Sequence, residues 1–324
     1  MNDASNCNLK DCDVPPERRP ALEAYRAKRR TWLDWIDKDE AHAIWTTLSA
    51  MIWNDVSFRT LAHLGANNPH SPLANSLLAE KLINGHIATQ VLAIRRLMDK
   101  TRDTISLRRL ISDIRSNYAL FTRENYVCND GLPYDYEAVM HAEIMQRDKT
   151  GPFWGATSGP QAWGTSQMAH QQFDRLSGIH PANRKREDRL PRALLDRIEG
   201  WLNSSDADEL TVWSHVYLAH AGSAENRKAL AEAIITNDRI TAVTRVLARV
   251  TEAISAYLLF AGGRSNALMP TAQFNQFEHL NRPVLQPDEL EGLHDLWDRL
   301  TDERDQFLEG VREDLLAGKD GPAS

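Results

Sequence analysis

The sequence predicts an all-α protein: a helical bundle with a loop-rich insertion and a long C-terminal helix. Several long segments carry apolar residues at intervals of three and four, the spacing that places them on one face of a helix. No segment alternates apolar and polar residues with the period of two that a half-buried strand shows. No repeat of fixed length is present.

Residues 1–31 are expected to form a flexible N-terminal arm, because Pro15, Pro16 and Pro20 interrupt regular structure there. Residues 32–121 are expected to form the first half of the bundle. The apolar positions of its three helical stretches are Trp45, Leu48, Ile52 and Val56; Leu73, Leu77, Leu78, Leu82, Ile87, Val91, Ile94, Leu97 and Met98; and Leu107, Leu110, Ile111 and Ile114, with Ser106 as an N-cap before the last group.

Residues 122–190 are predicted to be a loop-rich insertion with few regular elements, one of them a short helical piece around Val139 to Met145, and they contain the tryptophans Trp154 and Trp163. Loops of this length inside a compact protein are often functional. Residues 191–263 form the predicted second half of the bundle, and residues 264–324 a loop followed by the C-terminal helix. The apolar positions of these parts are Leu194, Leu195, Ile198, Trp201 and Leu202; Leu210, Trp213, Val216 and Tyr217; Ile240, Val243, Leu247, Val250, Ile254 and Tyr257; and Leu293, Trp297, Leu300, Phe307 and Val311. The last group is predicted to pack as a seam against another helix, within the chain or across a dimer.

The composition is that of a globular protein, with 42% hydrophobic and 26% charged residues in a chain of 324. At this length the chain forms one large domain or two ordinary ones. The formal net charge of -7 argues against an evenly basic surface that coats nucleic acid, although a local basic patch could bind phosphate. We expect a cytoplasmic protein without membrane contact, since neither a signal peptide nor an apolar run of about 18 residues is found.

The three cysteines are Cys7, Cys12 and Cys128. Cys7 and Cys12 lie in a polar segment that has no second pair to complete a zinc site, so surface thiols in a reducing compartment are expected. Two carboxylate–histidine pairs, Glu137 with His141 and Glu291 with His294, each lack a second pair. We therefore predict no metal and no cofactor.

The sequence has two basic clusters, and the second, beside the insertion, is a candidate for phosphate contact or, alternatively, a solvated basic stretch. They consist of residues 26–30 and of Arg184, Lys185, Arg186, Arg189 and Arg192. The chain contains no phosphate-binding glycine loop, dinucleotide fingerprint, zinc-protease motif or serine-nucleophile motif.

The most suggestive histidine is His220, within the stretch from Tyr217 to Ala221. It shares a broad helical face with Trp213 and Tyr217. His215 lies five residues before it, so the two histidines project about 140° apart on an α-helix and cannot share one site directly. A histidine at the edge of the core, satisfied by one hydrogen bond, is the alternative to a catalytic group.

Three segments together resemble the abortive-infection AbiU-like branch of the HEPN superfamily (higher eukaryotes and prokaryotes nucleotide-binding). They are residues 92–99 (LAIRRLMD), residues 105–111 (ISLRRLI) and residues 218–221 (LAHA). The resemblance covers roughly residues 40–115 and 192–260. It implies a helical bundle that dimerises and, in many members, a metal-independent ribonuclease of a toxin–antitoxin or phage-defence system.

In that family the active site uses an Arg-x4-6-His motif paired across the dimer. This chain departs from the pattern, because no arginine occurs between Gly200 and Ala219; the nearest one, Arg227, is downstream. The resemblance then implies His220 as general acid/base and Arg227 as the group that stabilises phosphate charge. A degenerate, non-catalytic member of the family is equally compatible with the sequence.

Two hypotheses follow. The first is a HEPN-like protein that acts on RNA or nucleotide, as a homodimer and with an antitoxin or other protein partner. Its substrate would be bound by His215, Tyr217, Arg184, Lys185 and Arg186. The second is a non-catalytic helical binding or scaffold protein that uses the Trp-rich insertion as its recognition surface.

Overall fold

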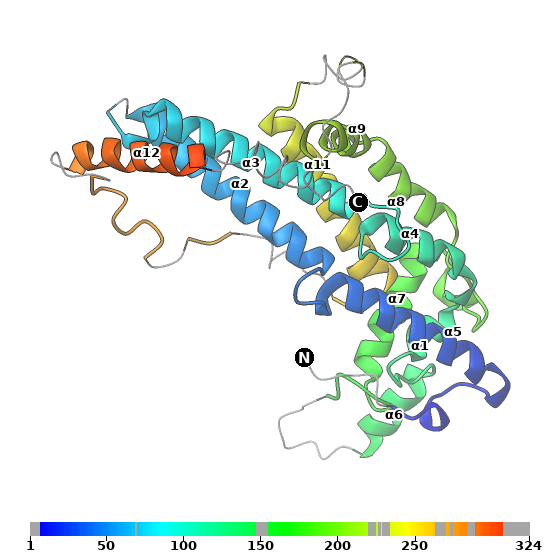
Figure 1. Ribbon diagram of the computed structural model, residues 1–324. Coiled ribbons are helices and arrows are strands. Elements are labelled where there is room, and N and C mark those ends of the chain that lie inside the picture. Colours follow the sequence, from blue (N-terminus) through cyan, green and yellow to red (C-terminus); the bar gives the residue numbers. More distant parts are fainter. Residues whose placement is uncertain are drawn as a thin grey trace, which may run out of the picture.

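The computed structural model describes residues 7–68, 70–146, 155–219, 225, 228, 234–262, 270–272, 275–283 and 289–306. The all-α prediction is confirmed: in these ranges the regular elements are helices (Figure 1), and the β-type pairing recorded there is a single bridge between Thr122 and Arg189. No helix among the described residues is long and apolar enough to cross a membrane.

The flexible arm expected over residues 1–31 is corrected for its described part, residues 7–31, which contains regular structure; residues 1–6 lie outside the described residues. Two short turns, η1 (Leu9–Asp11) and η2 (Pro16–Arg18), lead into helix α1 (Arg19–Leu33) and a π-helical turn η3 (Asp34–Lys38). Pro20 occupies the first turn of α1, where a missing N–H costs nothing, so this proline starts the helix instead of breaking it. Leu22, Tyr25 and Trp32 point into the core and are buried.

Helices α2 (Ile44–Asn67) and α3 (Ser76–Leu97) form an antiparallel hairpin with the short turn η4 (Pro72–Ala74) at its tip (Figure 1). Both helices and the break near Asn68 agree with the spacing of the sequence. The buried residues of α2 lie in its first third and those of α3 in its last half, so the base of the hairpin belongs to the core. Apolar side chains toward the tip are exposed, among them Leu64, Leu77 and Ile83.

The rest of the bundle consists of α4 (Leu107–Ser116), α8 (Ala193–Asn203), α9 (Ala207–Ser214) and α11 (Asn237–Glu252). Two π-helical turns, η7 (His215–Ala219) and η8 (Ala253–Leu258), extend α9 and α11. Helix α11 packs against α2, α3 and α8, while α3 also packs against α9. The apolar positions predicted for α4 and α11 are buried, as amphipathic helices require.

The region 122–190 contains more regular structure than predicted. It includes α5 (Arg123–Cys128), α6 (Tyr136–Gln146), α7 (Trp163–Ser177) and the short turn η6 (Pro181–Asn183). The short turn η5 (Tyr118–Leu120) directly precedes the region. Helix α7 escaped prediction because three of its four buried residues, Ser166, Ala169 and His170, are small or polar. The sequence of α7 therefore lacks the apolar periodicity that predicts a buried helix.

The expected surface position of the N-terminal thiols is also wrong in part. Cys12 is buried, Cys7 is half-buried, and the two sulfurs lie 3.7 Å apart as free thiols. Arg26 holds this segment on α1, because its guanidinium donates to the carbonyl of Cys7 and to Sγ of Cys12. Cys128 is buried as well, and burial raises its pKa well above the usual value.

The C-terminal helix α12 (Glu289–Asp305) is present, and its apolar side chains Leu293, Trp297 and Leu300 are exposed. Phe307 and Val311, which continue the predicted seam, lie outside the described residues. A partner for this seam stays a prediction.

Candidate functional site

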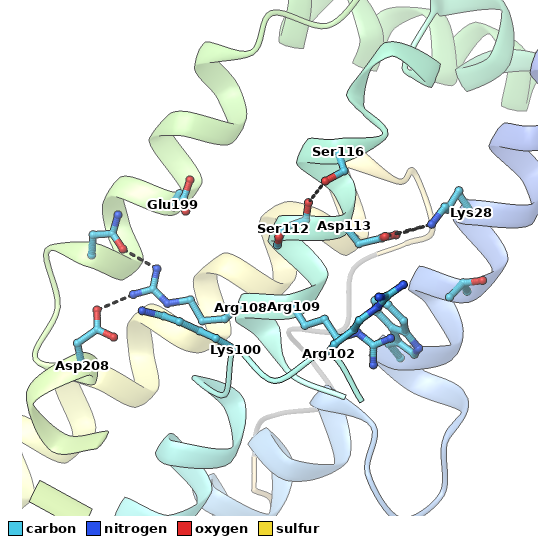
Figure 2. Close-up of a pocket in the computed structure, with 13 residues that line it drawn as sticks. Lys28, Lys100, Arg102, Arg108, Arg109, Ser112, Asp113, Ser116, Glu199 and Asp208 are labelled. Carbon is cyan, nitrogen blue, oxygen red and sulfur yellow. Dashed lines mark hydrogen bonds and ion pairs between the residues drawn. The ribbon is translucent and has the colours of Figure 1, made fainter. Parts of the chain in front are cut away.

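A basic pocket of about 840 Å³ opens where α1, α4 and the α8–α9 corner meet (Figure 2). Its residues come from four parts of the chain: Lys28, Thr31 and Trp35; Lys100 and Arg102; Arg108, Arg109, Ser112, Asp113 and Ser116; and Glu199, Asn203 and Asp208. The cations of α4 lie between Lys28 on α1 and Asp208 on α9 (Figure 2). We call this site the basic pocket.

The loop between α3 and α4 places two cations at the rim of the basic pocket. Ser106 fixes the loop, because its hydroxyl donates to the carbonyl of Asp99 and accepts the N–H of Arg109 at 3.1 Å. This is the N-cap predicted from the sequence. The carboxylate of Asp99 accepts hydrogen bonds from the side chain of Thr101 and from its backbone N–H, the latter at 2.7 Å, and these bonds lower the pKa of that carboxyl. Lys100 and Arg102 are carried by the loop so formed.

Two of the five cations are neutralised by carboxylates. Lys28 lies 3.0 Å from Asp113, which also accepts the indole N–H of Trp32. Arg108 donates to Asp208 at 2.7 Å and to the amide oxygen of Asn203, so it ties α4 to the α8–α9 corner. The third lining carboxylate, Glu199, pairs with Arg115 outside the pocket and therefore leaves the pocket cations uncompensated.

The other three cations have no carboxylate partner among the described residues. Arg109 lies over the ring of Trp35, 4.3 Å from its centroid, and donates to the carbonyl of Thr104. Lys100 and Arg102 are exposed at the rim. The pocket therefore has a local excess of positive charge in a chain whose net charge is -7.

A buried donor also remains unsatisfied at this pocket. The side chain of Arg108 is 9% exposed, and its Nε–H is buried without an acceptor in the described part of the chain. Buried N–H groups normally find acceptors. Guanidinium groups with spare donors, an ammonium group and the hydroxyl of Ser112 together suit the oxygens of a phosphate.

The predicted substrate contacts Arg184 and Arg186 lie elsewhere, in a network of ion pairs. Arg184 pairs with Asp174 at 2.6 Å, and Arg186 pairs with Glu124 at 2.8 Å and with Asp13. These contacts lower the pKa values of Asp174 and Asp13, since hydrogen bonds and nearby guanidinium charge outweigh the effect of burial. Lys185 is exposed between the two arginines.

Arg123 is the centre of this arginine network. It is fully buried, donates to Asp188 at 2.9 Å and to Asp174 at 2.7 Å, and lies over the ring of Phe173. The network joins α5, α7 and the segment around residues 184–188. Because its charges are paired within the protein, we interpret it as a structural connection between these elements.

His170 lies beside the same network and is kept neutral. Its Nε2 donates to the carbonyl of Tyr134, whereas Nδ1 is buried without a partner in the described residues. Burial lowers the pKa of His170 to about 4. A proton on Nδ1 would find no acceptor there, so this histidine is suited to a structural role at neutral pH.

The predicted catalytic residues His220 and Arg227 lie outside the described residues. His215 and Tyr217 are described and exposed on η7. Tyr217 stacks on Trp213 with ring centroids 4.9 Å apart. His215 follows Asp208 by seven residues, about 10 Å along the helix, so these residues do not belong to the basic pocket of their own chain.

Comparison of the chain with family models, with curated proteins and with solved structures finds no match. In the described ranges no group of three or more histidine, cysteine, aspartate and glutamate side chains could hold a metal ion. The fold and the pocket thus define an all-α protein with a local basic cavity.

Of the basic-pocket residues, Lys28 lies in the basic cluster 26–30 of the sequence analysis, whereas the cations of the α3–α4 region are not predicted as a site, although the sequence carries a signal for them. Residues 95–109 contain Arg95, Arg96, Lys100, Arg102, Arg108 and Arg109, against only Asp99 and Asp103. The same segment carries apolar helix positions and part of the family resemblance, which do not by themselves predict a site. Its pairing with Lys28 and Trp35 depends on the packing of α1, which the sequence did not reveal.

Proposed function

We propose that this protein binds RNA or a free nucleotide through the phosphates, using the basic pocket. The observation that carries the proposal is the set of three cations, Lys100, Arg102 and Arg109, that have no carboxylate partner in the described residues. Phosphate oxygens accept charge-assisted hydrogen bonds from such groups, and an exposed basic surface supplies most of the non-specific affinity for nucleic acid.

The resemblance to the HEPN superfamily supports the same ligand class. Within that proposal the stacked pair Trp213 and Tyr217 is a second contact, because bases stack on exposed aromatic rings. Tyr217 is 39% exposed. A strand of RNA long enough to reach the basic pocket and the Trp213–Tyr217 pair would run along α9, because Asp208 at the start of this helix lines the pocket and Tyr217 follows its last residue. A nucleotide occupies the basic pocket alone.

The test is the affinity for a fluorescently labelled single-stranded RNA of 20 nucleotides, measured by anisotropy at low salt. The double variant Lys100→Gln/Arg102→Gln is expected to bind about tenfold more weakly, since it removes two phosphate contacts. Arg175→Gln/Arg245→Gln removes the same charge from exposed positions elsewhere and is expected to bind like the wild type. Equal affinity of the two double variants would contradict the proposal.

Competition with unlabelled ligands distinguishes RNA from nucleotide. If the ligand is RNA, an unlabelled strand displaces the label, whereas ATP or GTP at the same phosphate concentration does not. Displacement by a mononucleotide at comparable concentration assigns the pocket to a nucleotide. Either result supports a phosphate-binding site. If neither RNA nor a mononucleotide binds, the proposed site is contradicted.

We further propose, from the resemblance, a metal-independent ribonuclease in which His220 is the general acid/base and Arg227 stabilises the developing phosphate charge. One structural feature favours a functional site here: η7 is a π-helical turn directly before His220, and such turns are frequent at functional sites. Purified protein in a metal chelator should cleave RNA, and His220→Ala should not. Equal activity in both proteins, or none in either, would remove the nuclease and leave the binding function intact.

The rival hypothesis of a scaffold protein that binds through its Trp-rich insertion finds less support. Trp163 is half-buried at the start of α7, and its indole N–H donates to Glu143 at 2.7 Å, so it serves to join α7 to α6. Trp154 lies outside the described residues. A cytoplasmic location, an antitoxin or other protein partner and a homodimer remain parts of the proposal that follow from the sequence.

A further inference from the structure

A second pocket, which we call the apolar pocket, lies between α8 and the α11–η8 segment and holds about 560 Å³. It is lined mainly by apolar side chains: Trp45, Leu176, Leu194, Ile198, Trp201, Ala248, Ala253, Tyr257 and Leu258. Pockets that bind small molecules have this size and this composition, with a few polar groups that fix orientation. The basic pocket shares no lining residue with it.

Helix α8 separates the two pockets. At about 100° per residue, Leu194, Ile198 and Trp201 lie on one face of α8, and Glu199 and Asn203 lie on the nearly opposite face. The ligands of the two sites would therefore be recognised by different sides of the same helix. For this reason a substitution in one pocket need not alter the other.

The space in the apolar pocket has a local cause. Ala248 and Ala253 contribute only methyl groups on the α11–η8 wall. Ala253 and Tyr257 both belong to the π-helical turn η8, in which the helix is wider than an α-helix. Such turns are common at functional sites. Trp201 and Tyr257 add aromatic surface, so the wall suits a hydrocarbon chain or a ring.

The polar groups of the apolar pocket carry a net positive charge. Arg249 lies over the ring of Trp201, 5.1 Å from its centroid, and Arg197 is exposed at the rim. Neither has a carboxylate partner among the described residues, and Glu252 is the one carboxylate that lines the pocket. Two guanidinium groups that lack a carboxylate partner can hold the carboxylate of a ligand.

Trp45 supplies an independent observation. Its side chain lines the pocket and is 6% exposed, and its indole N–H has no acceptor in the described part of the chain. Unsatisfied buried donors are uncommon in folded proteins. A polar atom of a bound molecule is one way in which such a donor is satisfied.

We infer that the apolar pocket binds an organic acid with an apolar body, such as a medium-chain fatty acid, with its carboxylate held by Arg197 and Arg249. Leu176, Ile198 and Tyr257 then cover the hydrocarbon chain. The inference does not depend on the RNA-binding proposal.

The test is isothermal titration calorimetry of the full chain with decanoate, kept below its micelle concentration, and with decanol. Decanoate is expected to bind one to one, and decanol at least tenfold more weakly. In Arg197→Gln/Arg249→Gln the affinity for decanoate should fall to that for decanol, while Arg175→Gln/Arg245→Gln should bind like the wild type. Ala248→Phe fills the pocket and should abolish binding of both ligands.

Three results would overturn the inference. The first is the absence of saturable decanoate binding by the wild type. The second is equal decanoate affinity in the two arginine double variants. The third is a wild-type dimer that Ala248→Phe converts to a monomer, because the pocket would then be covered by a second copy. Circular dichroism serves as the fold control, since Arg197→Gln/Arg249→Gln and Ala248→Phe should retain the helix content and cooperative thermal unfolding of the wild type.

Discussion

At the scale of single residues, the clearest physical feature is a buried histidine that stays neutral until the pH falls to about 4. His170 has one nitrogen bonded to the carbonyl of Tyr134 and the other buried without a partner in the described residues. Its pKa in the folded protein is about 4, against about 6.5 in an unfolded chain. Between these values the unfolded state takes up a proton that the folded state does not. Its contribution to stability is therefore complete above pH 6.5 and is lost as the pH falls to 4.

We predict that His170→Gln reduces the acid sensitivity of folding. Between pH 7 and pH 5 the wild type should lose about 2 kcal/mol of unfolding free energy through this group, and the variant should lose that much less. Urea unfolding at the two pH values measures the difference. Burial also lowers the pKa of His86. This second histidine accounts for the dependence of stability on pH that remains in the variant. His294→Gln, at an exposed position of α12, should behave like the wild type; an equal pH dependence in wild type and His170→Gln would contradict the prediction.

At the scale of elements, the N-terminus of α4 connects stability with the basic pocket. Ser106 both caps the helix and closes the loop that carries Lys100 and Arg102. We predict that Ser106→Ala costs about 1–2 kcal/mol of stability, because a helix N–H and the carbonyl of Asp99 lose their partner. Thermal unfolding measures this cost, and RNA anisotropy should show weaker binding at a temperature where the variant is still folded.

Ser106→Thr retains the hydroxyl and is the matched control, expected to lie close to the wild type in both measurements. If Ser106→Ala kept the stability of the wild type, the cap would contribute nothing. If it lost stability without loss of RNA affinity, the loop would not position the pocket cations.

The elements also show how far the sequence predicts the fold. The hairpin α2–α3, the cap of α4 and the apolar face of α11 followed from periodicity and capping residues. Helix α1 was missed because Pro20 was interpreted as a breaker, and α7 because small and polar residues form its buried face. The basic pocket could not be predicted as a site, because it depends on α1 packing beside α4 and on which carboxylates neutralise which cations.

At the scale of the whole molecule, exposed apolar surface remains on α12 and on the tip of the α2–α3 hairpin. Leu293, Leu296, Trp297 and Leu300 form a stripe along α12, and Trp297 is 61% exposed. We predict that this stripe belongs to the homodimer interface, since contiguous exposed apolar surface commonly marks an association site. Light scattering coupled to size exclusion should give a dimer for the wild type.

Trp297→Asp should shift that dimer to a monomer without lowering the unfolding temperature of the monomer. Arg299→Gln, on the same exposed helix but outside the stripe, is the control and should remain dimeric. A monomeric wild type at the concentrations used for RNA binding, or a dimeric Trp297→Asp variant, would contradict the prediction.

The central claim, that the basic pocket binds nucleic-acid phosphates, is tested most directly by the salt dependence of RNA affinity. For single strands the logarithm of the binding constant falls with the logarithm of salt concentration by about 0.7 for each phosphate neutralised. Lys100→Gln/Arg102→Gln should therefore have a slope that is shallower than that of the wild type by about 1.4. Arg175→Gln/Arg245→Gln should keep the wild-type slope. Parallel lines for the wild type and the Lys100→Gln/Arg102→Gln variant would show that these cations do not contact phosphate.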